Sequence, residues 1–197
     1  MKKIILSAII AGMIGSASAV NIADKGMGDV VMVPYYTAQK NQNTLLSLVN
    51  TTGDSKALKI RFREAYNSRD VLDFNIYMSP YDVWTANVKQ TVDGGAMLIS
   101  LDTTCTVPQL PKDGVAFRPY AYNGQLLPND GAPSDISRTL EGHIEIIEMG
   151  IADESDLNVW DHDRNGVADS THVNGVPENC KTFTKNWTKP DGAWIKD

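Results

Sequence analysis

Two neighbouring segments alternate strictly between apolar and polar residues, and this pattern constrains the fold more than any other feature of the sequence. The segment from Leu58 to Arg63 places an apolar residue before each of three basic residues. The segment from Leu72 to Met78 alternates in the same way. A period of two is that of a β-strand with one face in the core and one in water, whereas a helix requires a period near 3.6. We therefore predict two half-buried strands of an antiparallel sheet.

Four further apolar runs lie before or after these segments, at residues 30–36, 45–49, 83–88 and 97–101. Turn residues, such as those at 50–55, separate the runs. Pro34 lies within the first run and predicts an edge strand or a bulge, because proline cannot donate to a strand ladder. Six short strands at intervals of about 10 to 15 residues are typical of all-β proteins. We predict a mainly β fold, either an antiparallel immunoglobulin-like sandwich or a jelly-roll. The pattern does not predict the order of the strands.

Residues 106–138 contain five prolines and three glycines and predict a long irregular insertion, with one short strand at Val115 to Phe117. Thr139 to Ile151 returns to strand composition and is expected to rejoin the sheet. Long loops on a β scaffold often carry binding sites. The alternative is a surface insertion without any role.

The first nineteen residues have the three parts of a secretory signal peptide. Lys2 and Lys3 are followed by an apolar run over 4–14 and by small residues that end at Ala19. The apolar run is shorter than the roughly 20 residues that a membrane anchor requires. We predict cleavage after Ala19 and export to the periplasm, the cell surface or the extracellular medium, with no transmembrane segment in the mature chain. The expected organisation is then a signal peptide (1–19), a β-sandwich domain (20–151) and an acidic, loop-rich C-terminal extension (152–197).

The two cysteines, Cys105 and Cys180, predict a disulfide, because a single pair in an exported protein is usually oxidised. Such a bond would connect the C-terminal extension to the sandwich. The alternative is a pair of buried thiols.

The charge of the chain disfavours nucleic acid as a partner. The whole chain carries a net charge of −6, and loss of Lys2 and Lys3 with the signal peptide makes it −8. The sequence has no cluster of basic residues with which to bind phosphates.

Four segments, 43–52, 71–85, 142–150 and 172–177, resemble a group of exported bacterial proteins that are described only as cell-surface or hypothetical proteins. The resemblance extends from about Gly28 to Cys180. It implies export and a β-rich body, and it implies no catalytic residues. Members of the group tend to be longer, so the resemblance leaves open whether this sequence is a fragment.

A candidate calcium loop begins at Asp161. Oxygen-bearing residues occupy positions 1, 3, 5, 7 and 9 of the loop, with Gly166 at position 6, which is the spacing of ligands in calcium-binding loops; they are Asp161, Asp163, Asn165, Val167 through its carbonyl group, and Asp169. His172 stands at position 12, where a bidentate glutamate is expected. We therefore predict a structural Ca²⁺ site that is either weaker than usual or borrows a carboxylate from Asp153, Glu154 or Asp156. A solvated acidic turn is the main alternative, and zinc bound by His162 and His172 is disfavoured.

The sequence contains none of the common motifs of hydrolases, metalloproteases or phosphate-binding loops, and we predict that the protein is not an enzyme. Glu141, Glu145 and Glu148 are interpreted as a solvated strand face rather than as glycosidase carboxylates. A carbohydrate-stacking platform of aromatic residues is a weaker hypothesis; its members would be Tyr35, Tyr36, Tyr77, Tyr81, Trp84, Tyr120 and Tyr122.

These observations favour a non-catalytic secreted protein with a cell-surface, structural or adhesive role. Self-association through an exposed edge strand is one expected mode of action, with Val30 to Val33 as the suspected donor strand. The alternative is a module that binds a glycan or peptide through residues 106–138. A secreted hydrolase is a distant third.

Overall fold

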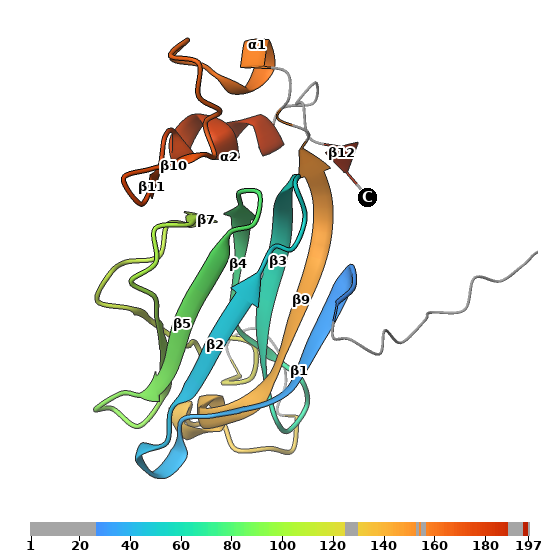
Figure 1. Cartoon of the computed structure of the whole chain (residues 1–197). Helices are drawn as coiled ribbons and strands as arrows, with labels where there is room; N and C mark the ends of the chain where they lie inside the picture. Colours follow the sequence, from blue (N-terminus) through green and yellow to red (C-terminus); the bar gives the residue numbers. More distant parts are fainter. Residues whose placement is uncertain (1–26, 125–129, 153, 155–156, 189–194, 197) are drawn as a thin grey trace, which may run out of the picture.

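The computed structural model describes residues 27–124, 130–152, 154, 157–188 and 195–196. Two antiparallel sheets pack face to face as a sandwich, and the C-terminal part of the chain covers one end of it (Figure 1). The predicted all-β class is therefore confirmed. The predicted signal peptide lies outside the described residues. Among the described helices, none has the length and apolar character needed to cross a membrane.

The first sheet has the strand order β1-β9-β3-β4-β7, and β12 adds to β9 on the same side as β1. Its strands are β1 (Val30–Thr37), β3 (Ser55–Glu64), β4 (Asp70–Met78), β7 (Cys105–Val107), β9 (Glu141–Ala152) and β12 (Ile195–Lys196). The second sheet has the order β2-β5-β6-β8. Its strands are β2 (Thr44–Val49), β5 (Val83–Gln90), β6 (Ala96–Ile99) and β8 (Val115–Ala116).

The two alternating segments form β3 and β4, which are neighbours in the first sheet. Their apolar residues face the second sheet and join the main core with residues such as Trp84 and Val88 of β5. The polar residues form ion pairs on the outer face, including Lys59 with Asp73 and Arg63 with Glu145. The period of two thus predicted both the strands and their buried face.

Pro34 lies in an edge strand, as predicted, and the register of β1 against β9 shifts between Val33 and Tyr36. Val30 to Val33 pair with Ile147 to Ile144 of β9 in the same chain. The segment suspected as a donor strand is therefore an integral strand of its own sheet.

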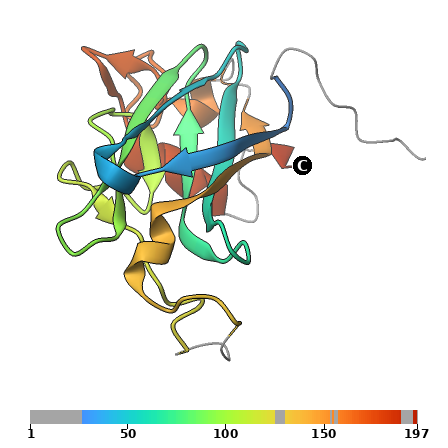
Figure 2. The same ribbon diagram turned by 90° about the horizontal axis from the view of Figure 1, so that it is seen from below.

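The insertion contains β7, β8 and the 3-10 helix η2 (Ile136–Leu140); its residues 125–129 lie outside the described part of the chain. Figure 2 shows that the chain on either side of these residues projects from the sandwich. A second 3-10 helix, η1 (Gln39–Asn41), connects β1 to β2.

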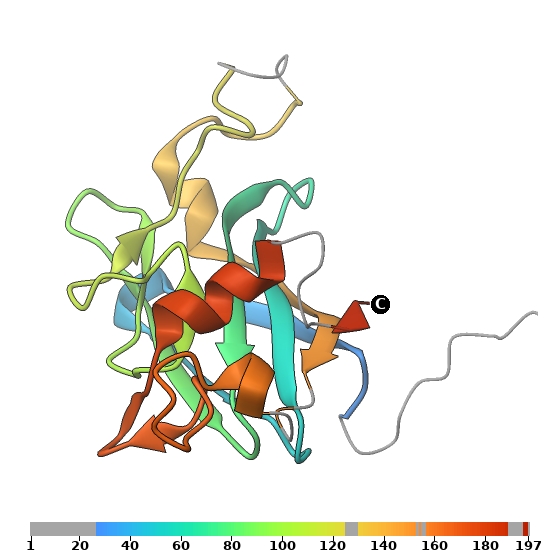
Figure 3. The ribbon, with the colours of Figure 1, turned by 90° about the horizontal axis from the view of Figure 1, so that it is seen from above.

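The C-terminal extension is more ordered than predicted. It contains α1 (Leu157–Trp160), the hairpin of β10 (His172–Val173) and β11 (Val176–Pro177), and α2 (Cys180–Thr188). Trp160 and Phe183 pack with Tyr77 of β4 in a second, smaller core. Figure 3 shows α2 lying across the end of the sandwich. Cys105 and Cys180 lie at disulfide distance, with a Cα–Cα separation of 5.4 Å, and so join α2 to β7.

Candidate functional site

The strands β1 and β2 form the open side of the sandwich. Each is the first strand of its sheet and, in the described part of the chain, pairs with a single neighbour, β1 with β9 and β2 with β5. The two strands are joined through η1 at one end and diverge toward the other (Figure 1). An edge strand presents backbone N–H and C=O groups that can pair with another strand. Two such edges therefore border the same opening.

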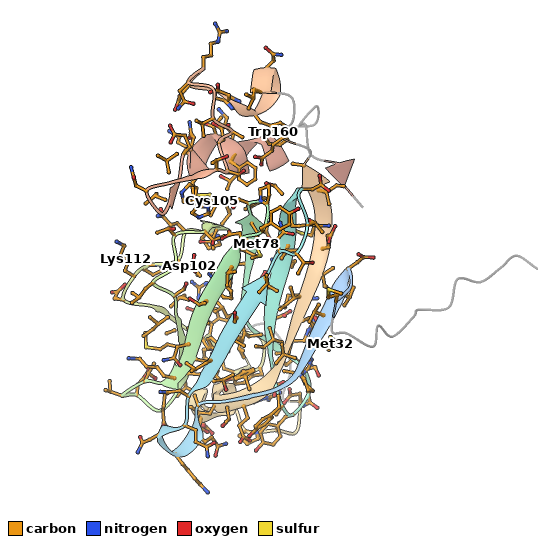
Figure 4. The ribbon with its side chains drawn as sticks, in the orientation of Figure 1. Met32, Met78, Asp102, Cys105, Lys112 and Trp160 are labelled. Atoms are coloured by element: carbon orange, nitrogen blue, oxygen red, sulfur yellow. A yellow bond between two sulfur atoms is a disulfide. The ribbon has the colours of Figure 1, made fainter. Side chains whose placement is uncertain are left out.

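A groove of about 460 Å³ lies between these edges. Apolar side chains from both sheets line it: Val31 and Val33 of β1, Leu48 of β2, Leu58 of β3, Met78 of β4 and Ile146 of β9. Val31, Val33 and Leu48 are only half-buried, although they point toward the core side of their strands. Figure 4 labels Met78 within the sandwich and Met32 on β1. The groove can therefore accept further apolar side chains between the sheets.

One end of the groove is polar. Lys56 Nζ lies 2.7 Å from Glu148 Oε1, and both side chains line the groove. The backbone N–H of Glu148 donates to the carbonyl of Asp29, which extends the pairing of β1 and β9 by one residue. Met27 and Gly28 line the same end. The first described residues of the chain thus line the groove.

The outward faces of the two edge strands are also apolar. Val30 and Met32 of β1 and Leu45 and Val49 of β2 are exposed, and Leu45 reaches 78% of its full accessibility. Natural edge strands are usually protected by charges, bulges or covering loops. Within the part of the chain that the structure describes, Pro34 and the adjacent bulge protect the second half of β1 in this way.

A second cavity, the disulfide cleft, has a volume of about 640 Å³ and lies where the insertion meets the C-terminal extension. It is lined by Trp84, Asp102, Cys105, Leu110, Lys112, Val176, Cys180 and Lys181, among others. Figure 4 shows Asp102, Cys105 and Lys112 around it. Asp102 accepts hydrogen bonds from the N–H of Thr85 and from Thr104. The cleft has the size of a small-ligand site, but the Asp102 carboxylate in its lining already accepts hydrogen bonds within the protein.

The candidate calcium loop folds back on its first residue. The Asp161 carboxylate accepts hydrogen bonds from the N–H groups of Asn165, at 3.0 Å, and Gly166, at 2.6 Å. Gly166 has a φ of 85°, as the sharp turn requires, and Arg164 has a φ of 54°. These features agree with the loop shape that the sequence predicted, but they bind no ion by themselves.

Two other predicted ligands, Asn165 and Asp169, form hydrogen bonds with different partners. Asn165 Nδ2 donates to Glu178 Oε1 at 2.5 Å, so Glu178 supplies a carboxylate beside the loop that the sequence analysis had not identified. Asp169 is buried, and its Oδ2 lies 2.5 Å from His162 Nδ1. Burial raises the pKa of Asp169, although His162 opposes this effect.

His172, at position 12 of the loop, lies elsewhere, with Nδ1 3.2 Å from Ser79 Oγ. Glu154, one of the expected substitute carboxylates, instead accepts hydrogen bonds from Ser55 and Ser170, and burial raises its pKa. Asp153 and Asp156, the other two, lie outside the described residues. Within the described ranges, no three His, Cys, Asp or Glu side chains come together as a metal-binding group. A calcium site would have to use amide and carbonyl oxygens as well, and it stays a prediction.

The aromatic platform is not formed by the seven residues proposed for it. Four of them are buried in the two cores, namely Tyr36, Tyr77, Trp84 and Tyr122. Only Tyr35, Tyr81 and Tyr120 are exposed. Buried rings cannot stack on a sugar at the surface, so this hypothesis was wrong as stated.

The residues that pair with the three histidines do not form a Ser-His-Asp triad. Ser79 contacts His172, whereas the carboxylate of Asp169 contacts His162, so serine and acid meet different histidines. The third histidine, His143, lies 3.9 Å from Glu145, which is already paired with Arg63.

Comparison with protein-family models, curated proteins and solved structures found no family, relative or structural neighbour that matches the chain. The resemblance to exported bacterial surface proteins therefore stays a prediction. Of the sites described, the groove between β1 and β2 combines an apolar cavity with two available strand edges.

Proposed function

We propose that the chain is a non-catalytic structural subunit of a secreted or cell-surface assembly and that it associates with itself through the open side of the sandwich. The observation that carries this proposal is the pair of edge strands, β1 and β2, on either side of an apolar groove. Main-chain hydrogen bonds to an edge and side chains in a groove are the two components of recognition by strand addition.

The exposed side chains of β1 and β2 support the same proposal. A soluble monomer gains nothing from leaving Leu45 and Val49 in water beside two open edges, and such edges promote aggregation. Contact with another copy would cover these residues. Export is expected from the predicted signal peptide, and the pairing of Cys105 with Cys180 suits an oxidising compartment.

The test is the assembly state of the oxidised chain beginning at Val20, measured by light scattering and negative-stain electron microscopy. We expect ordered polymers or defined oligomers whose size increases with protein concentration. Repeating the measurement with calcium and with a chelator separates assembly from any effect of the Asp161 loop. A strict monomer at all concentrations and in both conditions would refute the proposal.

Ligand binding is a second candidate function, favoured by the disulfide cleft. The first residues of the insertion line this cleft, and its volume lies within the usual range of small-molecule sites. Lys112 and Lys181 line the cleft, so an acidic glycan or peptide is the expected ligand. Glycan-array binding should be lost in a Lys112→Glu, Lys181→Glu double variant and retained in Lys40→Glu, whose lysine lies in η1.

A further inference from the structure

We infer that the groove between β1 and β2 accepts residues 20–26 of a second copy of this chain as an added β-strand. This inference rests on the proposed function and names the partner and the segment that carry it. It replaces Val30 to Val33, which the structure assigns to the sheet of their own chain.

The sequence of the segment suits the groove. Val20 and Ile22 alternate with Asn21 and Ala23, so an extended backbone would place the two large apolar side chains on one face. Seven extended residues span roughly 23 Å, which is longer than the six residues of β2. One face of the strand can thus fill the groove while its backbone follows an edge.

The position of the segment also suits the groove. Met27 and Gly28 line its polar end, and residues 20–26 precede Met27 directly in the sequence. The donor strand of one copy and the groove of the next are different surfaces, so the contact between copies is heterologous. Repeated head-to-tail, such a contact produces a ring or a filament.

The more regular edge for the added strand is that of β2. Its six residues pair with β5 in continuous register and contain no proline. On β1 the regular run ends at Val33, where the bulge and Pro34 begin. We expect the added strand to form its main-chain hydrogen bonds chiefly with β2 and to pack its apolar face against Val31 and Val33.

Two matched pairs of variants test this inference in the full mature chain. On the acceptor, Val31→Glu places a charge in the groove, whereas Met32→Glu places it on the opposite, exposed face of the same strand. On the donor, Ile22→Asp and Asn21→Asp change neighbouring residues on opposite faces of the segment. Circular dichroism establishes that each variant is folded, and sedimentation velocity measures its assembly.

We expect Val31→Glu and Ile22→Asp to be monomers, and Met32→Glu and Asn21→Asp to assemble as the unaltered chain does. Mixing the two monomeric variants gives the decisive result. The Val31→Glu chain keeps a working donor segment and the Ile22→Asp chain keeps a working groove, so the mixture should form a one-to-one dimer and stop there.

Three results would overturn the inference, and they separate it from the proposed function. If a chain beginning at Met27 assembles as well as the chain beginning at Val20, self-assembly stands but residues 20–26 are not the donor. If the mixture stays monomeric although the unaltered chain polymerises, the groove and the segment do not meet between copies. If the unaltered chain is a monomer and removal of residues 20–26 makes it bind a hydrophobic dye, the segment occupies the groove of its own chain, and both proposals fail.

Discussion

The guanidinium group of Arg138 forms two hydrogen bonds with the carboxylate of Glu64, which lies 74 residues earlier in the chain. Nε lies 2.8 Å from Oε2 and Nη2 lies 2.9 Å from Oε1, and both side chains are completely buried. Arg138 also binds Asp130 and lies over the ring of Tyr122, with 4.3 Å between Cζ and the ring centroid. This network connects the end of β3 to both the insertion and η2, and thereby fixes the irregular part of the chain on the sandwich.

Replacing Arg138 with methionine should destabilise the protein by about 3–5 kcal/mol, because Glu64 would remain buried without its partner. Lys59→Met, which removes a half-exposed ion pair with Asp73, is the matched control and should cost less than about 1 kcal/mol. Urea unfolding measures both values. Equal losses in the two variants would mean that the buried pair has no special role in stability.

Acid should weaken this network. Burial favours a raised pKa for Glu64, but hydrogen bonds from Arg138 and from the N–H groups of Arg69, Tyr66 and Asn67 outweigh it and lower the pKa. Hydrogen bonds from Arg138 also lower the pKa of Asp130. A carboxyl group with a lowered folded-state pKa stabilises the protein above its unfolded-state pKa and loses this contribution as pH falls.

We therefore expect the free energy of unfolding to decrease from just above pH 4.5 downward, as the two carboxylates take up protons. In Arg138→Met the network is already broken, so its stability should vary less over the same range. Urea unfolding between pH 3 and pH 7 measures both slopes. A variant that is as acid-sensitive as the unaltered chain would contradict this assignment.

The contribution of Glu154 to stability should have the opposite dependence on pH, and the variant Glu154→Gln tests this. Glu154 accepts hydrogen bonds from Ser55 and Ser170, and burial raises its pKa, so the charged form is unfavourable in the folded protein. The stability contributed by the protonated carboxyl group is present below the unfolded-state pKa and is lost as pH rises through the raised pKa.

Glutamine keeps a side-chain oxygen for one serine, donates to the other and carries no charge. We expect the variant to be more stable than the unaltered chain at pH 7, with the difference disappearing below about pH 4. Thermal unfolding of both proteins at pH 7 and below about pH 4 measures this difference in stability. A loss of stability at pH 7 would show that the two serines require a charged acceptor.

Calcium should raise the thermal midpoint of unfolding if the loop at Asp161 binds it, because a ligand of the folded state stabilises it by mass action. Asp163→Asn is the most informative variant, since among the described residues the Asp163 carboxylate accepts a single hydrogen bond, a long one of 3.4 Å from the Asn179 amide. Asp161 is less suitable because it also holds the backbone of Asn165 and Gly166.

The shift produced by calcium should be smaller in Asp163→Asn and in Glu178→Gln, and unchanged in the control Asp113→Asn, which lies in the insertion. Calorimetric titration provides an independent measurement. No heat of binding and no shift at millimolar calcium would identify the loop as a solvated acidic turn.

Local patterns in the sequence determined the strands of the sandwich. The alternation in β3 and β4 fixed their backbone period and their buried face, since side chains of a strand point to opposite sides in turn. Pro34 indicated an edge strand or a bulge because it lacks an N–H group, and the structure has both. Two cysteines in a chain with a predicted export signal were enough to predict the approach of Cys105 to Cys180.

The small helical core at the end of the sandwich was missed, although the sequence contained a signal for it. Asn179 caps α2 by accepting a hydrogen bond from the N–H of Thr182, and Phe183 and Trp187 are four residues apart. The polar, acidic composition around them concealed this short pattern. Phe183 became a core residue only because Tyr77 and Trp160 lie opposite it.

Only the tertiary structure decided which residues meet across long sequence separations. Glu64 and Arg138 are ordinary charged residues in the sequence, and their partnership depends on how the insertion returns to β3. In the same way, Glu178 reaches the Asp161 loop through the path of β10 and β11. The groove arises because β1 and β2, consecutive in the chain, belong to different sheets that separate at one end. Periodicity is a property of neighbouring residues and is visible in a sequence, whereas a groove or a buried ion pair depends on contacts that form only when distant segments pack together.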